Sequence, residues 1–193
     1  MAGTLSAGML KVPQGLFFSK NHTWAHLERS GIAKIGLDDL LLHLTGDLRV
    51  INHAKPGEIV RKGGLLAQID HYGKQLKIFS PISGEIKSTN TALKENPEIL
   101  QEDPFRSGWI YQIKPSDWIS ETRSCYLAGE ATNWMTKELS RFKDFVMVST
   151  AKNSPGTAGI ILQDGGEIRE NILAELPNEL WQDFQRDFLD STE

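Results

Sequence analysis

The chain has 193 residues, of which 39% are hydrophobic and 24% charged, and its formal net charge is -4. This length suits one ordinary domain, or one domain with a substantial extension, and the near-average composition excludes intrinsic disorder and collagen-like repeats. Acidic and basic residues are mixed along the chain, which excludes a polybasic nucleic-acid-binding surface. Cys125 is the single cysteine, so no disulfide can form within the chain.

The N-terminal segment shows no targeting signal. Residues 1–10 lack a charged start and a sustained apolar stretch, so they make a poor signal peptide. The densest apolar cluster, residues 40–44, is far shorter than the roughly 20 residues that span a bilayer. We therefore expect a soluble cytoplasmic protein without membrane contact, in which residues 1–15 form a flexible N-terminal arm.

The next segment, residues 16–116, has the character of a compact β domain. Short runs of strand-forming residues between glycines and prolines predict strands at 22–27, 32–37, 49–51, 58–60, 65–69, 76–79 and 84–86. One short helix is expected after Asp38, which resembles an N-cap, and Gly46 is placed to end it.

Residues 117–193 change to a helical pattern. Apolar spacing predicts an amphipathic helix within 127–146 that carries Trp134, and a final helix after Pro177 that carries Trp181. A loop over 151–157, a short strand over 159–163 and a turn at 164–166 are expected between them. Because such helices are not stable with their apolar faces exposed, we expect this extension to dock on the β domain; docking on a partner is the alternative.

Two glycine-containing segments, residues 57–69 and 80–86, resemble the biotinyl/lipoyl carrier domain. The flanking segments narrow the resemblance to the glycine cleavage system H-protein family. They resemble that family's E-H-x-W, G-I-T-D-Y, L-G-D, N-P-x-L, D-P-Y and G-W-L motifs at residues 21–24, 36–39, 44–47, 96–100, 103–105 and 108–110. The third of these has one residue more than the usual spacing. The resemblance covers roughly residues 17–116 and implies a mainly β barrel-sandwich hybrid, a flattened barrel of two similar sheets, followed here by C-terminal helices.

In the family that this chain resembles, the lipoyl lysine lies in E-S-V-K-A at the tip of the hairpin between those two segments. Counting back without a gap from Ser80 places the family's glutamate at Asp70 and its lysine at Gly73. Lys74 is the immediate neighbour, and a one-residue shift in a hairpin turns a side chain to the opposite face. Glycine offers no amine for attachment, but it readily adopts the positive φ of a tight two-residue turn.

From this substitution we predict a non-enzymatic, H-protein-like chain that has lost the lipoyl arm, holds no cofactor and acts as a binding or assembly module. His71, Tyr72 and Gly73 are the candidate partner-binding residues, and proteins that recognise lipoyl domains are the candidate partners. The alternative is a working carrier with lipoate on Lys74, which shuttles aminomethyl groups and electrons in glycine cleavage or a related redox system.

Other candidate chemistry has little support in the sequence. The five histidines show no metal-ligand spacing, and His22 and His26 are four residues apart in a strand-like segment rather than on a helix face. Nucleotide-binding and hydrolase motifs are absent, and the neighbours of Cys125 indicate packing rather than a nucleophile. We therefore predict no metal site and no catalytic residues.

Overall fold

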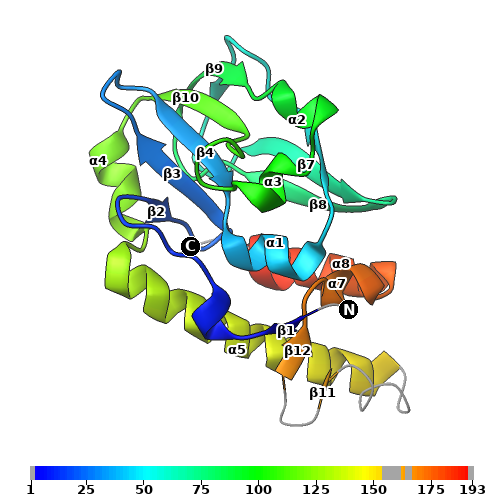
Figure 1. Cartoon of the computed structure of the whole chain (residues 1–193). Helices are drawn as coiled ribbons and strands as arrows, with labels where there is room; N and C mark the ends of the chain where they lie inside the picture. Colours follow the sequence, from blue (N-terminus) through cyan, green and yellow to red (C-terminus); the bar gives the residue numbers. More distant parts are fainter. Residues whose placement is uncertain (1–2, 154–161, 164–166, 191–193) are drawn as a thin grey trace.

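The computed structural model describes residues 3–153, 162–163 and 167–190. Its β domain contains a six-stranded antiparallel sheet of order β2-β3-β4-β10-β9-β6 and a three-stranded sheet of order β5-β7-β8 (Figure 1). The larger sheet consists of β2 (Phe17–Phe18), β3 (Thr23–Leu27), β4 (Ala33–Leu37), β6 (Ile59–Val60), β9 (Gly84–Thr89) and β10 (Tyr111–Pro115). The smaller sheet consists of β5 (Arg49–Asn52), β7 (Leu65–His71) and β8 (Lys74–Phe79).

The strands form where apolar and polar residues alternate in the sequence. In β8, Leu76 and Ile78 are buried, whereas Gln75 and Lys77, which precede each of them, are exposed. This period of two is expected of a strand that covers a core on one face. Each of the seven predicted strands is present, with ends that differ by a few residues. Three short helices were not predicted in this domain or directly after it, namely α2 (Ala92–Glu95), α3 (Ile99–Glu102) and α4 (Trp118–Glu121).

The predicted short helix is α1 (Asp39–Thr45), and both of its signals are confirmed. The Asp38 carboxylate accepts a hydrogen bond from the Leu41 amide at 2.9 Å, which caps the first turn. Gly46 ends the helix with a positive φ of 72°.

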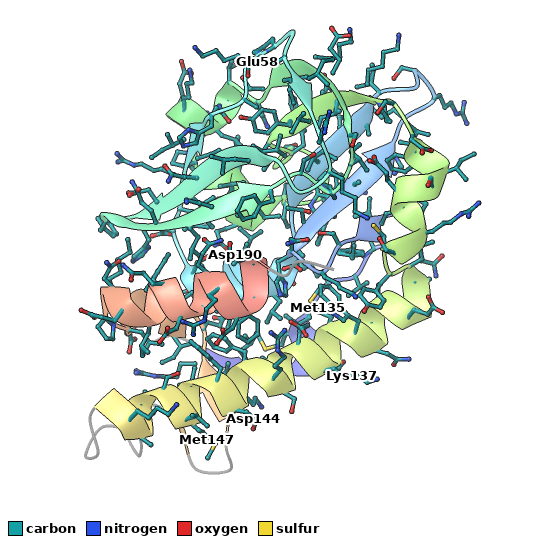
Figure 2. All side chains as sticks on the ribbon, turned by 180° about the vertical axis from the view of Figure 1, so that it is seen from behind. Glu58, Met135, Lys137, Asp144, Met147 and Asp190 are labelled. Atoms are coloured by element: carbon teal, nitrogen blue, oxygen red, sulfur yellow. The ribbon has the colours of Figure 1, made fainter. Side chains whose placement is uncertain are left out.

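The C-terminal extension packs its apolar faces within this chain. Its elements are η2 (Thr122–Ser124), α5 (Ala128–Asn153), β11 (Leu162–Gln163), β12 (Glu167–Arg169), α7 (Ile172–Glu175), α8 (Asn178–Phe184) and η3 (Gln185–Leu189), the last a turn of π-helix. Figure 2 shows α8 lying between α5 and the β-sheets. Rings from α5 and α8–η3 meet with centroids 5.5–6.3 Å apart, in an aromatic cluster of Phe142, Phe145, Phe184 and Phe188.

The segment that follows α5 differs in part from the prediction. The helix α5 continues to Asn153, so the loop expected over 151–157 was wrong for its first three residues. The apolar face of α5 keeps its 3.6-residue period to Val146, and nothing in residues 147–153 breaks the helix. The remaining residues of that loop, part of the strand over 159–163 and the turn at 164–166 lie outside the described residues.

The N-terminal segment lies against the extension, whereas the sequence suggested a flexible arm. Strand β1 (Thr4–Leu5) pairs antiparallel with β12, which in turn pairs with β11, and the short 3-10 helix η1 (Ala7–Met9) follows. Leu5 is fully buried opposite Ile168. Because the strand that receives residues 4–5 comes from the other end of the chain, no local pattern could have revealed this pairing.

The hairpin of β7 and β8 as a candidate functional site

The hairpin that joins β7 to β8 turns in two residues. His71 is paired with Lys74, and between them Tyr72 has φ 48° and Gly73 has φ 90°. Positive φ at both central residues is typical of a type I′ turn, whose twist matches that of the flanking strands. The Asp70 carboxylate accepts a 3.3 Å hydrogen bond from the Gly73 amide and supports the turn. Tyr72 and Gly73 are therefore the two residues at the tip.

Tyr72 is presented to solvent above the ring of His71. Its side chain is 88% exposed, and its ring contacts His71 edge to face with centroids 4.9 Å apart. The His71 ring also stacks on Trp181 of α8 at 6.1 Å, and its Nδ1 hydrogen-bonds the Asp47 carbonyl at 2.7 Å. Of the three predicted partner-binding residues, the structure places Tyr72 and Gly73 at the exposed tip and His71 half-buried beneath them.

Lys74 lies beside the tip and is bound to the extension. Its Nζ donates hydrogen bonds of 2.7 Å to the carbonyl oxygens of Ala174 and Leu176, and it lies 5.9 Å from the ring centre of Trp181. Lys74 is the first residue of β8 and has the same strand parity as Leu76, so its side chain leaves the strand on the side of the buried residues.

Two hollows adjoin the hairpin. A pocket of about 400 Å³ at the base of Tyr72 is lined by acidic, basic and apolar side chains, among them Asp47, Arg49, Leu48 and Glu98. A larger groove of about 960 Å³ runs between β7–β8 and α8–η3. The amide side chains of Gln68, Gln75, Gln182 and Gln185 contribute to its lining. The extension supplies one wall of this groove, so the surroundings of the hairpin depend on its docking.

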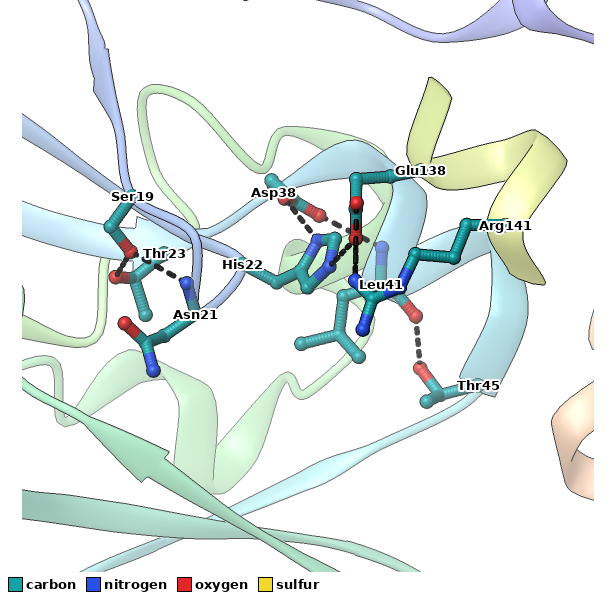
Figure 3. A network of polar contacts seen from close by, with 9 residues as sticks. All are labelled: Ser19, Asn21, His22, Thr23, Asp38, Leu41, Thr45, Glu138 and Arg141. Atoms are coloured by element: carbon teal, nitrogen blue, oxygen red, sulfur yellow. Dashed lines mark hydrogen bonds and ion pairs between the residues drawn. The ribbon is translucent and has the colours of Figure 1, made fainter. Parts of the chain in front are cut away.

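A buried charged network joins the β domain to α5 (Figure 3). His22 Nδ1 lies 2.7 Å from Asp38 Oδ2, and His22 Nε2 lies 3.3 Å from Glu138 Oε2. Arg141 donates to the same Glu138 carboxylate at 2.9 Å. Burial alone would lower the pKa of His22, but the charges and hydrogen bonds of Asp38 and Glu138 outweigh it and raise that pKa to about 9.

His22 is therefore a buried imidazolium at neutral pH, held between two carboxylates. The pKa of Glu138 is lowered because His22 and Arg141 outweigh the opposing effect of its burial. The sequence had marked His22 as part of a family motif but did not reveal its role, because Glu138 is 116 positions away. The arrangement ties α5 to the loop before β3, and His22, Asp38 and Glu138 are all buried, so we interpret it as structural.

Cys125 and the possible metal ligands are the remaining sequence candidates. Burial raises the pKa of the Cys125 thiol, which disfavours the reactive thiolate. Within residues 3–153, 162–163 and 167–190, no cluster of three or more His, Cys, Asp or Glu side chains is suited to hold a metal ion. No helix in the same part of the chain is long and apolar enough to cross a membrane.

Comparison with known proteins identifies the family. The profile of the family described as "Glycine cleavage H-protein" matches residues 16–138. The "Probable glycine cleavage system H protein" of Thermococcus gammatolerans is 34% identical over 119 residues, which are 62% of this chain and 88% of the relative. The glycine cleavage system H protein of Thermus thermophilus is 32% identical over 108 residues, which are 56% of this chain and 84% of that protein.

A solved structure supports the fold. The crystal structure of a glycine cleavage system H protein from Mycobacterium marinum aligns with a TM-score of 0.50 and 24% identity, over 54% of this chain and 87% of its own. It confirms the barrel-sandwich fold of the β domain. The family profile also continues past residue 116 to Glu138, the α5 residue that contacts His22. The chain therefore belongs to the glycine cleavage H-protein family, a family of carriers rather than enzymes.

Proposed function

We propose that this chain has the shape of the H-protein carrier without its lipoyl arm, and that it acts as a non-enzymatic binding or assembly module in the cytoplasm. One observation carries the proposal: the two-residue tip of the hairpin consists of Tyr72 and Gly73 and has no amine. The nearest amine is that of Lys74, and it is hydrogen-bonded to the extension.

Attachment of a swinging arm needs a primary amine on a long, flexible side chain at a rigid turn. Gly73 supplies the turn but not the amine. Lys74 has the amine, but its side chain points toward α7 and α8 and two of its three N–H donors are engaged there. These contacts support the absence of an arm at either position.

The substitution Gly73→Lys tests this reading. Nothing lies within 4 Å of a Cβ added at Gly73, and its φ of 90° adds strain on the order of 1–2 kcal/mol, which a folded hairpin tolerates. When the variant is made in cells with active lipoylation machinery, we expect a lipoyl adduct at residue 73 by peptide mass spectrometry. The matched control is Gly57→Lys, because Gly57 has the same φ of 90° and equally open space.

The proposal predicts an adduct on the Gly73→Lys variant and none on the Gly57→Lys control or the wild-type chain. A folded Gly73→Lys chain that stays unmodified would contradict the assignment of residue 73 to the arm position. A wild-type chain modified at Lys74 would contradict the absence of the arm.

Tyr72 is the residue that we propose as the centre of partner recognition. Tyrosine is enriched among the residues that dominate binding energy at protein interfaces, and Tyr72 is 88% exposed above the His71–Trp181 stack. Other proteins of the glycine cleavage system are the first partners to test, by surface plasmon resonance with each purified protein. We expect Tyr72→Ser to weaken binding at least tenfold.

The control for that measurement is Ile59→Ser, because Ile59 is 74% exposed and lies on β6, outside the hairpin. Equal affinities for the wild type and Tyr72→Ser would remove the hairpin tip from the interface. Equal losses for both substitutions would indicate a nonspecific apolar contact instead.

The second candidate function is a carrier with lipoate on Lys74. The observation in its favour is that Lys74 directly follows the two-residue tip. This function requires that α7 and α8 release the Lys74 amine before a ligase can act on it. A lipoyl adduct mapped to Lys74 in the wild-type chain is the result that would establish it.

A further inference from the structure

The C-terminal extension contacts β8 at more than one point. Beyond the Lys74 hydrogen bonds, Gln185 Oε1 accepts a 2.6 Å hydrogen bond from the Lys77 amide, and Gln185 Nε2 donates to the Lys77 carbonyl at 3.3 Å. The side chain of Gln185 thus bonds to the free edge of β8 as a neighbouring strand would. The α8–η3 segment therefore covers the edge of the strand as well as the amine of Lys74.

The groups that receive Lys74 are fixed by packing within the extension. Trp181 is fully buried, and its indole N–H donates to the Leu173 carbonyl of α7 at 2.7 Å. The carbonyls of Ala174 and Leu176 lie at the C-terminal end of α7, where helix carbonyls have no partner within the helix. The partial negative charge of such carbonyls attracts a cation, and so does the face of an aromatic ring. A lysine amine that lies beside both is therefore stabilised by both.

We propose that α7 and α8–η3 form a lid over the Lys74 amine, and that the docked lid keeps this amine from being acylated. The inference rests on the proposed function and adds to it how the lysine next to the tip stays unmodified. The chain's own extension covers the Lys74 amine. Lys74 is therefore an acylation site that becomes accessible only when the extension moves away from it.

The chemistry explains why docking matters. In acylation the neutral amine attacks the carbonyl carbon of an activated acyl donor, such as an acyl adenylate; the C–N bond forms, the bond to the adenylate breaks, and the amine releases its proton. The nitrogen must present a lone pair to the donor. The Lys74 nitrogen donates to two carbonyls beside Trp181, so attack on an acyl donor requires these contacts to break.

Lys77 provides an internal reference because it lies on the same strand with an exposed side chain. The full-length chain is pulsed with N-hydroxysuccinimidyl acetate, an activated acyl donor, and acetylation of each lysine is measured by peptide mass spectrometry. In the wild type we expect Lys74 to react at least tenfold more slowly than Lys77. In Trp181→Ala, the rate at Lys74 rises toward that at Lys77.

Two further variants keep the test decisive. Gln185→Ala removes two bonds to β8 without opening a large cavity, so it loosens the lid even where Trp181→Ala fails to fold. Trp118→Ala is the matched control, because Trp118 packs on Phe17 with ring centroids 5.0 Å apart, and α4, which carries it, lies on the other side of the β domain from the tip of the β7–β8 hairpin (Figure 1). We expect Gln185→Ala to speed labelling of Lys74 and Trp118→Ala to leave it unchanged, with folding checked by circular dichroism.

Equal acetylation rates of Lys74 and Lys77 in the wild type would overturn the proposal that the extension forms a lid. So would slow labelling of Lys74 in a folded Gln185→Ala chain, because protection would then come from elsewhere. Neither result bears on the absence of an amine at Gly73, so the proposed function would stand. Conversely, lipoate found on Lys74 in cells would contradict the proposed function and would show that the extension leaves Lys74 in cells, even where chemical labelling of the purified wild type is slow.

Discussion

At the scale of single residues, His22 makes the stability of this protein depend on pH. Its imidazolium is buried between the carboxylates of Asp38 and Glu138. Its pKa is raised from 6.5 to about 9 in the folded chain. A group whose pKa is raised on folding stabilises the fold fully below its unfolded pKa, and this stabilisation is lost as pH rises through the folded value.

We predict that this contribution, about 3 kcal/mol in the free energy of unfolding, is lost between about pH 6.5 and pH 9. Urea unfolding at a series of pH values measures it. The difference in pH dependence between the wild type and His22→Gln isolates the effect of His22, and His53→Gln, at an exposed position, is the control. If the wild type and His22→Gln lose stability in parallel across this range, His22 is not charged in the fold.

At the scale of elements, the hairpin shows what a gapless count along the sequence can and cannot predict. The count placed Gly73 at a two-residue turn, and the positive φ values of Tyr72 and Gly73 confirm that turn. The same count also placed Lys74 off the tip. It could not reveal the partners of Lys74, because the Ala174 and Leu176 carbonyls belong to a segment 100 residues further along the chain.

The Lys74 contacts predict a measurable effect on stability. In Lys74→Met the aliphatic part of the side chain is kept, but the carbonyls of Ala174, in α7, and Leu176, directly after it, lose their hydrogen-bond donor. We expect the free energy of unfolding to fall by about 1–3 kcal/mol, the range for leaving buried polar groups unsatisfied. Denaturant unfolding measures the loss.

The control for this measurement is Lys87→Met, because Lys87 forms an exposed ion pair with Glu85 at 2.7 Å. Such surface pairs contribute about 0–1 kcal/mol. If the two methionine variants unfold at the same denaturant concentration, the Lys74 hydrogen bonds do not hold the extension to the hairpin.

At the scale of the whole molecule, the N-terminal strand β1 and the C-terminal extension pair with each other and pack against the β domain. The sequence predicted the strands, the first helix and both apolar helix faces, because each depends on a local period of two or 3.6 residues. It left open what covers those faces. The aromatic cluster between Phe142 of α5 and Phe184 of α8 answers this, and the pairing of Leu5 with Ile168 adds the N-terminus to the same layer.

Long-range contacts of this kind have no signature in a single sequence. The His22–Glu138 pair, the β1–β12 pairing and the Lys74 contacts each join segments more than 99 positions apart. All three involve the extension or the N-terminal segment. The strands of the β domain and the two apolar helix faces of the extension were predictable, whereas the contacts that the extension makes with the rest of the chain were not.

The central claim is that this member of the H-protein family has no lipoyl arm. It is tested most directly by the intact mass of the full-length wild-type chain, produced in cells with active lipoylation machinery and supplied with lipoate. A lipoylated H protein from the same cells serves as the positive control. We predict the mass of the bare polypeptide; a lipoyl adduct on the wild-type chain, mapped to Lys74 by peptide sequencing, would contradict the claim and identify the protein as a carrier.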